Sequence, residues 1–333
     1  MLLSIVIPHY NIPTELLRQC IDSIIAQGIP AEEYEVIVVD DGSEAPPTWI
    51  VDTYNGHNVR LILNAHGGPG AARNRGIEEA RGRYIQFVDA DDYLLTNGQM
   101  AQCLAALKEE RPQILRFGYI VTTDRKSPKT AKTKRVKFGN TISGAMHMRD
   151  NNLSGSPCTY FFLKKLATDN NTVFSTNIFH EDEEFNTKLH YHAQTLIESN
   201  ATLYCYCTRE GSTTANRSKD FERRRIDNLF TIIEKTNAFK EENATRSNTI
   251  QRDAITRKLR TLTVDAILNM MYDGRKAKEI YDTCLERLAP IGLFPLPQAH
   301  YSHKYRIFRT LANTRRGMRA LRFIIPSRKP AKR

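Results

Sequence analysis

The sequence Tyr-Glu-Val-Ile-Val-Val-Asp-Asp-Gly-Ser, residues 34–43, is a mostly apolar run that ends in an acidic turn. Such a run is typical of a strand buried in a parallel sheet. Two other runs have the same form: residues 2–8 lead into His-Tyr-Asn at 9–11, and residues 83–88 lead into Asp-Ala-Asp-Asp at 89–92. Because ligands gather beyond the carboxyl ends of parallel strands, the three polar clusters predict a single binding edge.

Helical patterns separate these predicted strands. Apolar residues recur at helical spacing over residues 14–27, and a glycine-rich sequence at 67–70 opens a predicted helix over 71–80. Strands that alternate with helices predict an α/β domain with a mostly parallel, Rossmann-like sheet. The further elements that we expect in it are strands at 59–63, 114–121, 159–163 and 202–207, and helices at 97–110 and from about 181 onward.

Toward the C-terminus the pattern becomes helical alone. A boundary is therefore expected near residue 216, between an α/β domain over 1–216 and a helical C-terminal extension over 217–333. Residues 122–137 are rich in Lys, Thr and Ser and predict an exposed loop or hairpin. The helices expected in the extension span residues 221–239, 249–272 and 277–288.

The composition, 41% hydrophobic and 26% charged over 333 residues, predicts a folded globular protein. No stretch approaches the roughly 20 apolar residues that span a bilayer, and the first apolar run is too short for a secretion signal. We therefore expect a cytoplasmic protein, or one peripheral on the cytoplasmic face of a membrane. Its six scattered cysteines do not form a disulfide framework and are expected to be reduced, structural thiols.

The charge of the chain is concentrated in its last segment. Residues 303–333 contain eleven Lys and Arg and no Asp or Glu, whereas the remaining residues contain 37 of each sign. Because apolar residues interleave with these cations, the tail predicts contact with an anionic membrane through residues 304–333. A merely solvated tail is the alternative, and nucleic acid is not expected because no base-reading motif accompanies the charge. Gly317 and Pro326 predict that the tail forms short helices, divided at those two residues.

Asp89, Asp91 and Asp92 place three carboxylates directly after a predicted strand. Crowded carboxylates repel one another unless a cation neutralises them. Mg²⁺ and Mn²⁺ take such oxygen ligands and are usually shared with a diphosphate. The alternative is a solvated strand end whose aspartate caps the next helix.

Two other motifs lie at the same predicted edge. Asp40 and Asp41 either cap a helix or accept hydrogen bonds from a nucleotide base or ribose. The glycines at 67–70 let a ligand approach the backbone at a helix start, with Arg73 nearby. This glycine motif matches neither the Walker phosphate loop nor the dinucleotide-binding fingerprint.

Four motifs in order resemble those of family 2 glycosyltransferases: Ile-Val-Ile-Pro-His-Tyr-Asn at 5–11, Val-Val-Asp-Asp-Gly-Ser at 38–43, Gly-Ala-Ala-Arg-Asn-Arg-Gly at 70–76 and Phe-Val-Asp-Ala-Asp-Asp at 87–92. The resemblance is dense over residues 1–95 and looser to about 215. It implies the GT-A fold, a nucleotide-sugar donor (chiefly a UDP-sugar) and a Mn²⁺ or Mg²⁺ ion held by Asp91 and Asp89. The nucleotide-sugar site that it implies consists of Pro8, His9, Tyr10, Asn11, Asp40, Asp41, Gly70, Arg73, Asp89, Ala90 and Asp91.

The resemblance also suggests how these residues divide the work. It places residues 8–11 and Asp41 against the base and ribose, Arg73 beside the base or diphosphate, and Asp89 against the ribose or sugar. His9 stands where the family more often has a small or hydroxylic residue, so its contact with the base is expected through the backbone. Residues 1–95 would thus bind the donor, and residues 96–216 would form the acceptor side.

Glu181 and Asp182 open the helix predicted in the second half of the domain. Acidic residues at a helix start are favourable for the helix dipole alone. By resemblance, the pair lies across the sugar, and Asp182 is the general base that takes the proton of the acceptor hydroxyl. A single displacement would then invert the anomeric configuration. Arg209 and Ser212 either touch the diphosphate or belong to a structural strand with an exposed arginine.

The resemblance favours a glycan or polyprenyl-diphosphate-linked glycan as acceptor, in surface polysaccharide synthesis. Two other classes of protein are alternatives to a glycosyltransferase. A nucleotidyltransferase would need a lysine-bearing glycine loop after the first strand, where this chain has residues 8–11. A catalytically silent binding module is disfavoured by the joint presence of Asp41, Asp89, Asp91 and Asp182.

Overall fold

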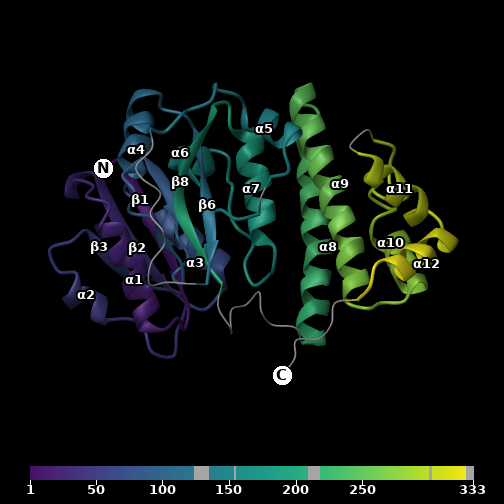
Figure 1. Cartoon of the computed structure of the whole chain (residues 1–333), viewed down its shortest axis with the longest axis horizontal. Helices are drawn as coiled ribbons and strands as arrows, with labels where there is room; N and C mark the ends of the chain where they lie inside the picture. The colour runs from purple at the N-terminus through teal and green to yellow at the C-terminus, as the bar shows by residue number, and fades with distance from the viewer. Residues whose placement is uncertain (124–134, 154, 209–217, 300–301, 328–333) are drawn as a thin grey trace. The chain divides into compact units, whose positions relative to one another are not determined.

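The computed structural model describes residues 1–123, 135–153, 155–208, 218–299 and 302–327. The chain forms two compact units, Met1–Ser212 and Thr213–Arg333 (Figure 1). The first is an α/β unit, and every secondary-structure element within the described residues of the second is a helix.

One eight-stranded sheet organises the first unit, in the order β3-β2-β1-β4-β7-β6-β8-β5. The first four strands are parallel, β7 runs antiparallel to both of its neighbours, β8 is parallel to β6, and β5 is antiparallel to β8. The predicted α/β fold with a mostly parallel sheet is therefore confirmed. The strands are β1 (Leu3–His9), β2 (Tyr34–Asp40), β3 (Val59–Leu63), β4 (Tyr84–Phe87), β5 (Tyr93–Leu94), β6 (Ile114–Thr122), β7 (Tyr160–Leu163) and β8 (Leu196–Cys207).

Helices flank this sheet (Figure 1). In α1 the buried residues Leu17, Cys20, Ile21 and Ile24 recur at the spacing expected of one helix face. All six cysteines are free and buried, as the composition predicted. The helices of this unit are α1 (Thr14–Ile25), α2 (Trp49–Thr53), α3 (Pro69–Glu79), α4 (Gln99–Glu109), α5 (Gly144–Asp150), α6 (Lys164–Thr168) and α7 (Glu181–His192), with a 3₁₀ turn at Ala31–Glu33.

The observed elements differ from the sequence prediction in two ways. The strand expected at 202–207 is the second half of β8, whose first half carries polar residues and shifts its register opposite Gly118. Short α2, α5 and α6 were not predicted, because five to seven residues are too few to show a helical period. Most of the loop predicted at 122–137 lies outside the described residues.

In the second unit, two long helices lie side by side (Figure 1). These are α8 (Lys219–Glu242) and α9 (Thr249–Tyr272), and α9 begins with a capping box in which Asn248 and Gln251 each accept the other's backbone N–H. The chain continues into α10 (Ala277–Arg287), α11 (His303–Ala312) and α12 (Arg315–Ile324). No helix among the described residues is long and apolar enough to cross a membrane.

The basic tail forms two short helices, but the predicted division at Gly317 is wrong. The break lies at Asn313 and Thr314, where the Thr314 hydroxyl caps α12 by accepting the N–H of Gly317 at 3.0 Å. Gly317 lies inside α12, where a Cβ atom would collide with the carbonyl oxygen of Leu311. The glycine thus permits close packing of α11 on α12. Pro326 follows the end of α12, as expected.

Candidate functional site

The three predicted polar clusters meet at one edge of the sheet. β1 lies between β2 and β4 and is parallel to both, and His9 pairs in register with Asp40. The carboxyl ends of these strands therefore face the same side, which we call the carboxyl edge. It comprises residues 8–11, 40–43, 64–68 and 89–92.

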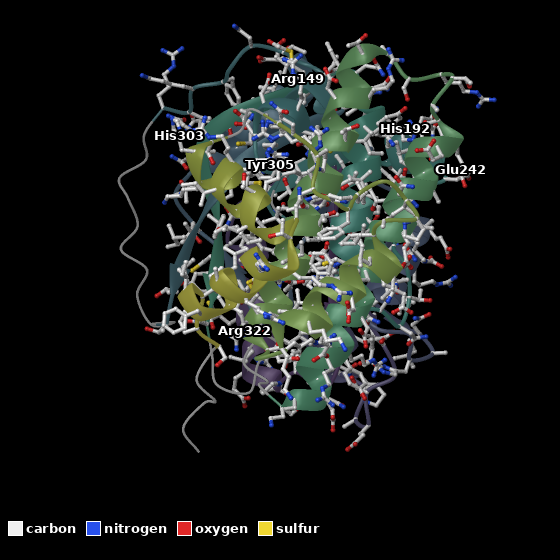
Figure 2. All side chains as sticks on the ribbon, turned by 90° about the vertical axis from the view of Figure 1, so that its right-hand side faces the viewer. Arg149, His192, Glu242, His303, Tyr305 and Arg322 are labelled. Atoms are coloured by element: carbon white, nitrogen blue, oxygen red, sulfur yellow. The ribbon has the colours of Figure 1, made fainter. Side chains whose placement is uncertain are left out.

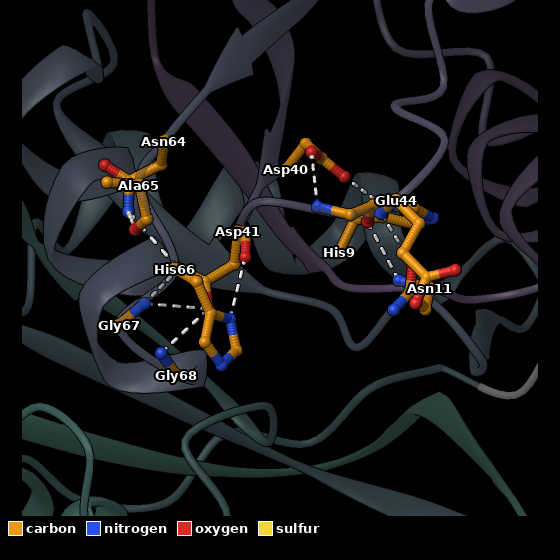
Figure 3. A network of polar contacts seen from close by, with 11 residues as sticks. His9, Asn11, Asp40, Asp41, Glu44, Asn64, Ala65, His66, Gly67 and Gly68 are labelled. Carbon is orange, nitrogen blue, oxygen red and sulfur yellow. Dashed lines mark hydrogen bonds and ion pairs between the residues drawn. The ribbon is translucent and has the colours of Figure 1, made fainter.

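His9 and Asp40 form a buried network under this edge (Figure 3). His9 Nδ1 lies 2.8 Å from Asp40 Oδ1 and 3.3 Å from the hydroxyl of Ser43, whose N–H donates to Asp40 Oδ2 at 3.1 Å. Burial alone would raise the pKa of Asp40, but the hydrogen bonds from Ser43 and His9 outweigh it and lower that pKa. Both side chains are thus engaged inside the protein, which leaves backbone atoms for any ligand contact at His9.

Asp41 anchors the loop that leads into α3. Its buried carboxylate accepts the N–H of Gly68 at 2.7 Å and that of Gly67 at 3.1 Å, and its Oδ2 lies 3.0 Å from His66 Nδ1. The ring of His66 lies 4.4 Å from that of Tyr10, and both rings are about half exposed. The carboxyl edge therefore presents an aromatic face next to a carboxylate that is held by the loop at 66–68.

Arg73 joins the two halves of the candidate site. From α3, its Nη2 donates to Asp89 Oδ1 and its Nη1 donates to Glu181 Oε1, both at 3.0 Å. The rings of Phe87 and Phe174 flank the guanidinium at 5.9 and 5.5 Å. Burial would lower the pKa of Arg73, but the two carboxylates raise it, so the guanidinium stays charged. One buried cation thus connects the strand end at 89–92 to the start of α7.

Asp92 links the carboxyl edge to β8 by hydrogen bonds. It is buried, and it accepts hydrogen bonds from the Tyr204 hydroxyl and, at 2.7 Å, from the N–H of Cys207. Burial, together with the charge of Asp89, raises the pKa of Asp92 to about 8. Both oxygens of Asp92 are engaged by β8, whereas Asp89 and Asp91 are half-buried and partly open to solvent.

Glu181 and Asp182 occupy the first turn of α7, across Arg73 from Asp89. The residue before them, His180, has a left-handed backbone (φ 66°) and provides no side-chain cap, so α7 starts without a conventional N-cap. Burial, with the charges of Glu181 and Glu183, raises the pKa of Asp182 to about 8. Burial also raises the pKa of Glu181, and the charge of Arg73 offsets part of that shift. A carboxyl group with a raised pKa is a stronger base once it has ionised, as a general base requires.

No three His, Cys, Asp or Glu side chains gather as a complete metal cage within the described ranges. A Mg²⁺-type site does not require one, because such ions take one or two carboxylates and complete their shell with water and phosphate oxygens. Asp89 and Asp91 are the half-buried carboxylates at this point, whereas Asp92 is buried. The residues at the carboxyl edge therefore fit a divalent cation that arrives with a diphosphate.

The remaining predicted site residues differ in how deeply they are buried. Gly70 packs against Ser175, whose carbonyl oxygen would lie 2.5 Å from an added Cβ, and Ala90 is buried, so both shape the site from inside. Pro8 is half-buried and Asn11 is exposed at the carboxyl edge. Arg209 and Ser212 lie outside the described residues.

Two residues of the site were not found from the sequence. Tyr204 reaches Asp92 and also accepts the N–H of Asp89 at 3.2 Å, although it lies more than a hundred positions away. His66 forms the aromatic face with Tyr10. Tyr204 is brought here by the pairing of β8 with β5 and with β6, and no local pattern in the sequence signals these pairings.

Comparison with known proteins places these observations in a family. Residues 4–172, just over half of the chain, match the model described as glycosyl transferase family 2. The chain is 29% identical over 220 residues to EpsJ of Bacillus subtilis, described as an uncharacterized glycosyltransferase, covering 64% of this chain and 63% of that protein. It is 27% identical over 213 residues to TarS of Staphylococcus aureus, a poly(ribitol-phosphate) β-N-acetylglucosaminyltransferase, covering 62% of this chain and 36% of TarS.

Solved structures show the same fold. The structure of S. aureus TarS 1–349 in complex with UDP-GlcNAc gives a TM-score of 0.58 at 20% identity, covering 97% of this chain and 89% of that chain. A mannosyltransferase from Pyrobaculum calidifontis, in complex with GDP-Man and Mn²⁺, gives a TM-score of 0.55 at 15% identity, covering 97% and 86%. The sequence matches span less than two thirds of EpsJ and of TarS.

Proposed function

Because the chain belongs to glycosyl transferase family 2, we propose that it transfers a sugar from a nucleoside diphosphate donor, a UDP-sugar, to a hydroxyl group of a glycan. The observation that carries this proposal is the bridge of Arg73 between Asp89 and Glu181. Through Arg73, Asp89 at the carboxyl edge is connected to the start of α7, where Glu181 and Asp182 lie. A donor and an acceptor require two such sets of polar groups on either side of one sugar.

On the donor side, we propose that the base stacks at the exposed face of Tyr10 and that Asn11 and Asp41 lie beside the base and ribose. Asp89 and Asp91 would hold Mn²⁺ or Mg²⁺ together with the diphosphate, and when bound this ion supplies positive charge to the departing nucleoside diphosphate. Arg73, held by two carboxylates, would keep Asp89 in place toward the sugar and does not need to contact the nucleotide itself. The nucleotide complexes of TarS and of the mannosyltransferase, with Mn²⁺ in the latter, support a donor of this class.

On the acceptor side, Asp182 is the proposed general base. Its raised pKa favours uptake of a proton from the acceptor hydroxyl as that oxygen attacks the anomeric carbon. Glu181 is committed to Arg73, which leaves Asp182 as the member of the pair that serves the acceptor. One displacement from the face opposite the leaving group inverts the anomeric configuration.

We further propose that residues 1–95 bind the donor and residues 96–216 form the acceptor side, with 217–333 as an accessory helical region. A glycan, or a glycan linked to polyprenyl diphosphate, is the acceptor that we propose, in surface polysaccharide synthesis on the cytoplasmic side of a membrane. The name of TarS, which acts on poly(ribitol-phosphate), supports a cell-surface polymer as the acceptor class.

A panel of nucleotide sugars tests this function. Hydrolysis of each donor and its effect on melting temperature would be measured with Mn²⁺ and with EDTA. We expect a UDP-sugar to stabilise the protein and to be hydrolysed slowly, and both effects to require the metal. If UDP-sugars and other nucleotide sugars leave the melting temperature unchanged under both conditions, the proposed donor class is wrong.

A further inference from the structure

The outer face of α11 and α12 exposes large apolar side chains. Phe323 is 93% exposed, Ile324 67% and Ile307 61%, and Phe323 is the most exposed large hydrophobic residue in the described part of the chain. Figure 2 looks onto this side of the molecule, with His303, Tyr305 and Arg322 labelled. Apolar side chains exposed to this degree contribute little to the fold, so the core of the second unit does not account for them.

The same two helices also expose cations. Lys304, Arg306, Arg316 and Arg319 are exposed, and neither helix contains an acidic residue. Within α12, positions 316, 319 and 323 follow the three- and four-residue spacing of a single helix face. A phenylalanine therefore shares its face with two arginines.

Other residues of the same helices serve the fold instead. Met318 and Leu321 are buried where α12 packs on α10 and α11. Arg315 pairs with Asp282 at 3.2 Å, and Arg322 donates to the backbone oxygens of Arg275 and Ile325. One face of α11 and α12 thus packs on the rest of the second unit. We call the opposite, exposed face the outer face.

We propose that the outer face, defined by Lys304, Arg306, Ile307, Arg316, Arg319, Phe323 and Ile324, docks on an anionic lipid bilayer. Cations near a membrane are drawn to acidic headgroups, and the aromatic and aliphatic side chains enter the boundary between headgroups and acyl chains. A nucleic acid or polyphosphate would use the cations but gives no reason for exposed Phe323 and Ile324. Residues 328–333 add four more cations by sequence. This proposal is independent of the reaction that the first unit carries out.

Sedimentation of the full-length protein with vesicles tests the proposal. Vesicles of equimolar phosphatidylcholine and phosphatidylglycerol should bind the protein, and pure phosphatidylcholine vesicles should not. The double variant Phe323→Ser/Ile324→Ser should bind the anionic vesicles at least about tenfold more weakly, because both removed side chains are apolar. The matched control is Val51→Ser/Leu63→Ser, which removes side chains of 62% and 61% exposure from the first unit and should bind as the wild type does.

The charge variant Arg316→Gln/Arg319→Gln should also bind more weakly, and its binding should depend less on salt. The proposal is overturned if the wild type fails to bind anionic vesicles at low salt. It is equally overturned if only the charge variant loses binding while Phe323→Ser/Ile324→Ser binds normally, since the face would then be a general polyanion site. Because all four positions are exposed, circular dichroism and the thermal shift with UDP should match the wild type, which separates this test from the test of donor binding.

Discussion

Replacing Arg73 with methionine tests the connection between the two halves of the site. The substitution removes the positive charge between Asp89 and Glu181 and keeps a long apolar side chain between Phe87 and Phe174. The side chains of Arg73 and Glu181 are only 8% and 10% exposed, so their ion pair is weakly screened. The side chain of Asp89 is 35% exposed, so solvent screens its ion pair with Arg73 and that pair contributes less to stability. Removing one partner of a buried pair costs about 3–5 kcal/mol, and we expect about 3 kcal/mol here.

The loss should depend on pH with a defined sign. Arg73 lowers the pKa of Glu181, so the variant's Glu181 binds its proton at higher pH than in the wild type. The folded variant therefore holds more protons than the folded wild type at intermediate pH, and its stability falls more steeply as pH rises. The destabilisation should be largest in mildly alkaline solution and should shrink as pH falls toward the ordinary value for glutamate.

Urea unfolding followed by tryptophan fluorescence measures this effect. The single tryptophan, Trp49, lies in α2 and reports on the first unit alone, which avoids overlap with unfolding of the second unit. In a double-mutant cycle, Arg73→Met and Glu181→Gln should couple by about 1–3 kcal/mol. The control is Arg75→Met, whose own side chain is 45% exposed against 8% for Arg73, and it should cost less than about 1 kcal/mol. Strict additivity in the cycle, or an equal cost at Arg75, would refute the buried bridge.

Three further predictions address the base, the metal and the tail. Asp182→Asn should keep the thermal shift with UDP but lower the transfer rate by about two orders of magnitude or more, and the wild-type rate should rise with pH through about 8 as this carboxyl ionises; near-normal turnover would limit Asp182 to a role in the helix. Calorimetry should show tighter UDP binding with Mn²⁺ than with EDTA, and Asp91→Asn should remove that difference; equal affinities in the wild type would contradict a metal at the diphosphate. Gly317→Ala should destabilise the second unit by about 1–3 kcal/mol in thermal unfolding, because its Cβ meets Leu311, and an unchanged melting temperature would contradict this packing.

Three strands of the carboxyl edge, β1, β2 and β4, were predictable because each is buried along nearly its whole length. Their mostly apolar runs end in polar residues, and parallel pairing then brings those ends together. The sequence could not indicate how the residues there are engaged. Asp40, Asp41 and Asp92 form one class by composition, but one pairs with His9, one binds the loop at 66–68 and one binds β8. These partners come from other elements, so only the folded backbone distinguishes the three carboxylates.

The sequence also does not indicate which residues of the basic tail are buried and which are exposed. Its charge and its apolar residues are evident from the sequence, but the sequence does not separate Met318 and Leu321, which are buried, from Phe323 and Ile324, which are exposed. That separation follows from the start of α12 at Arg315, after the Thr314 cap, and from the packing of the helix on α10 and α11. Deleting residues 304–333 would remove both groups together and expose the α10 surface that Met318 covers. Loss of vesicle binding in such a truncation would therefore not distinguish a lost membrane contact from a partly unfolded unit, whereas substitutions confined to the outer face test the proposed membrane contact alone.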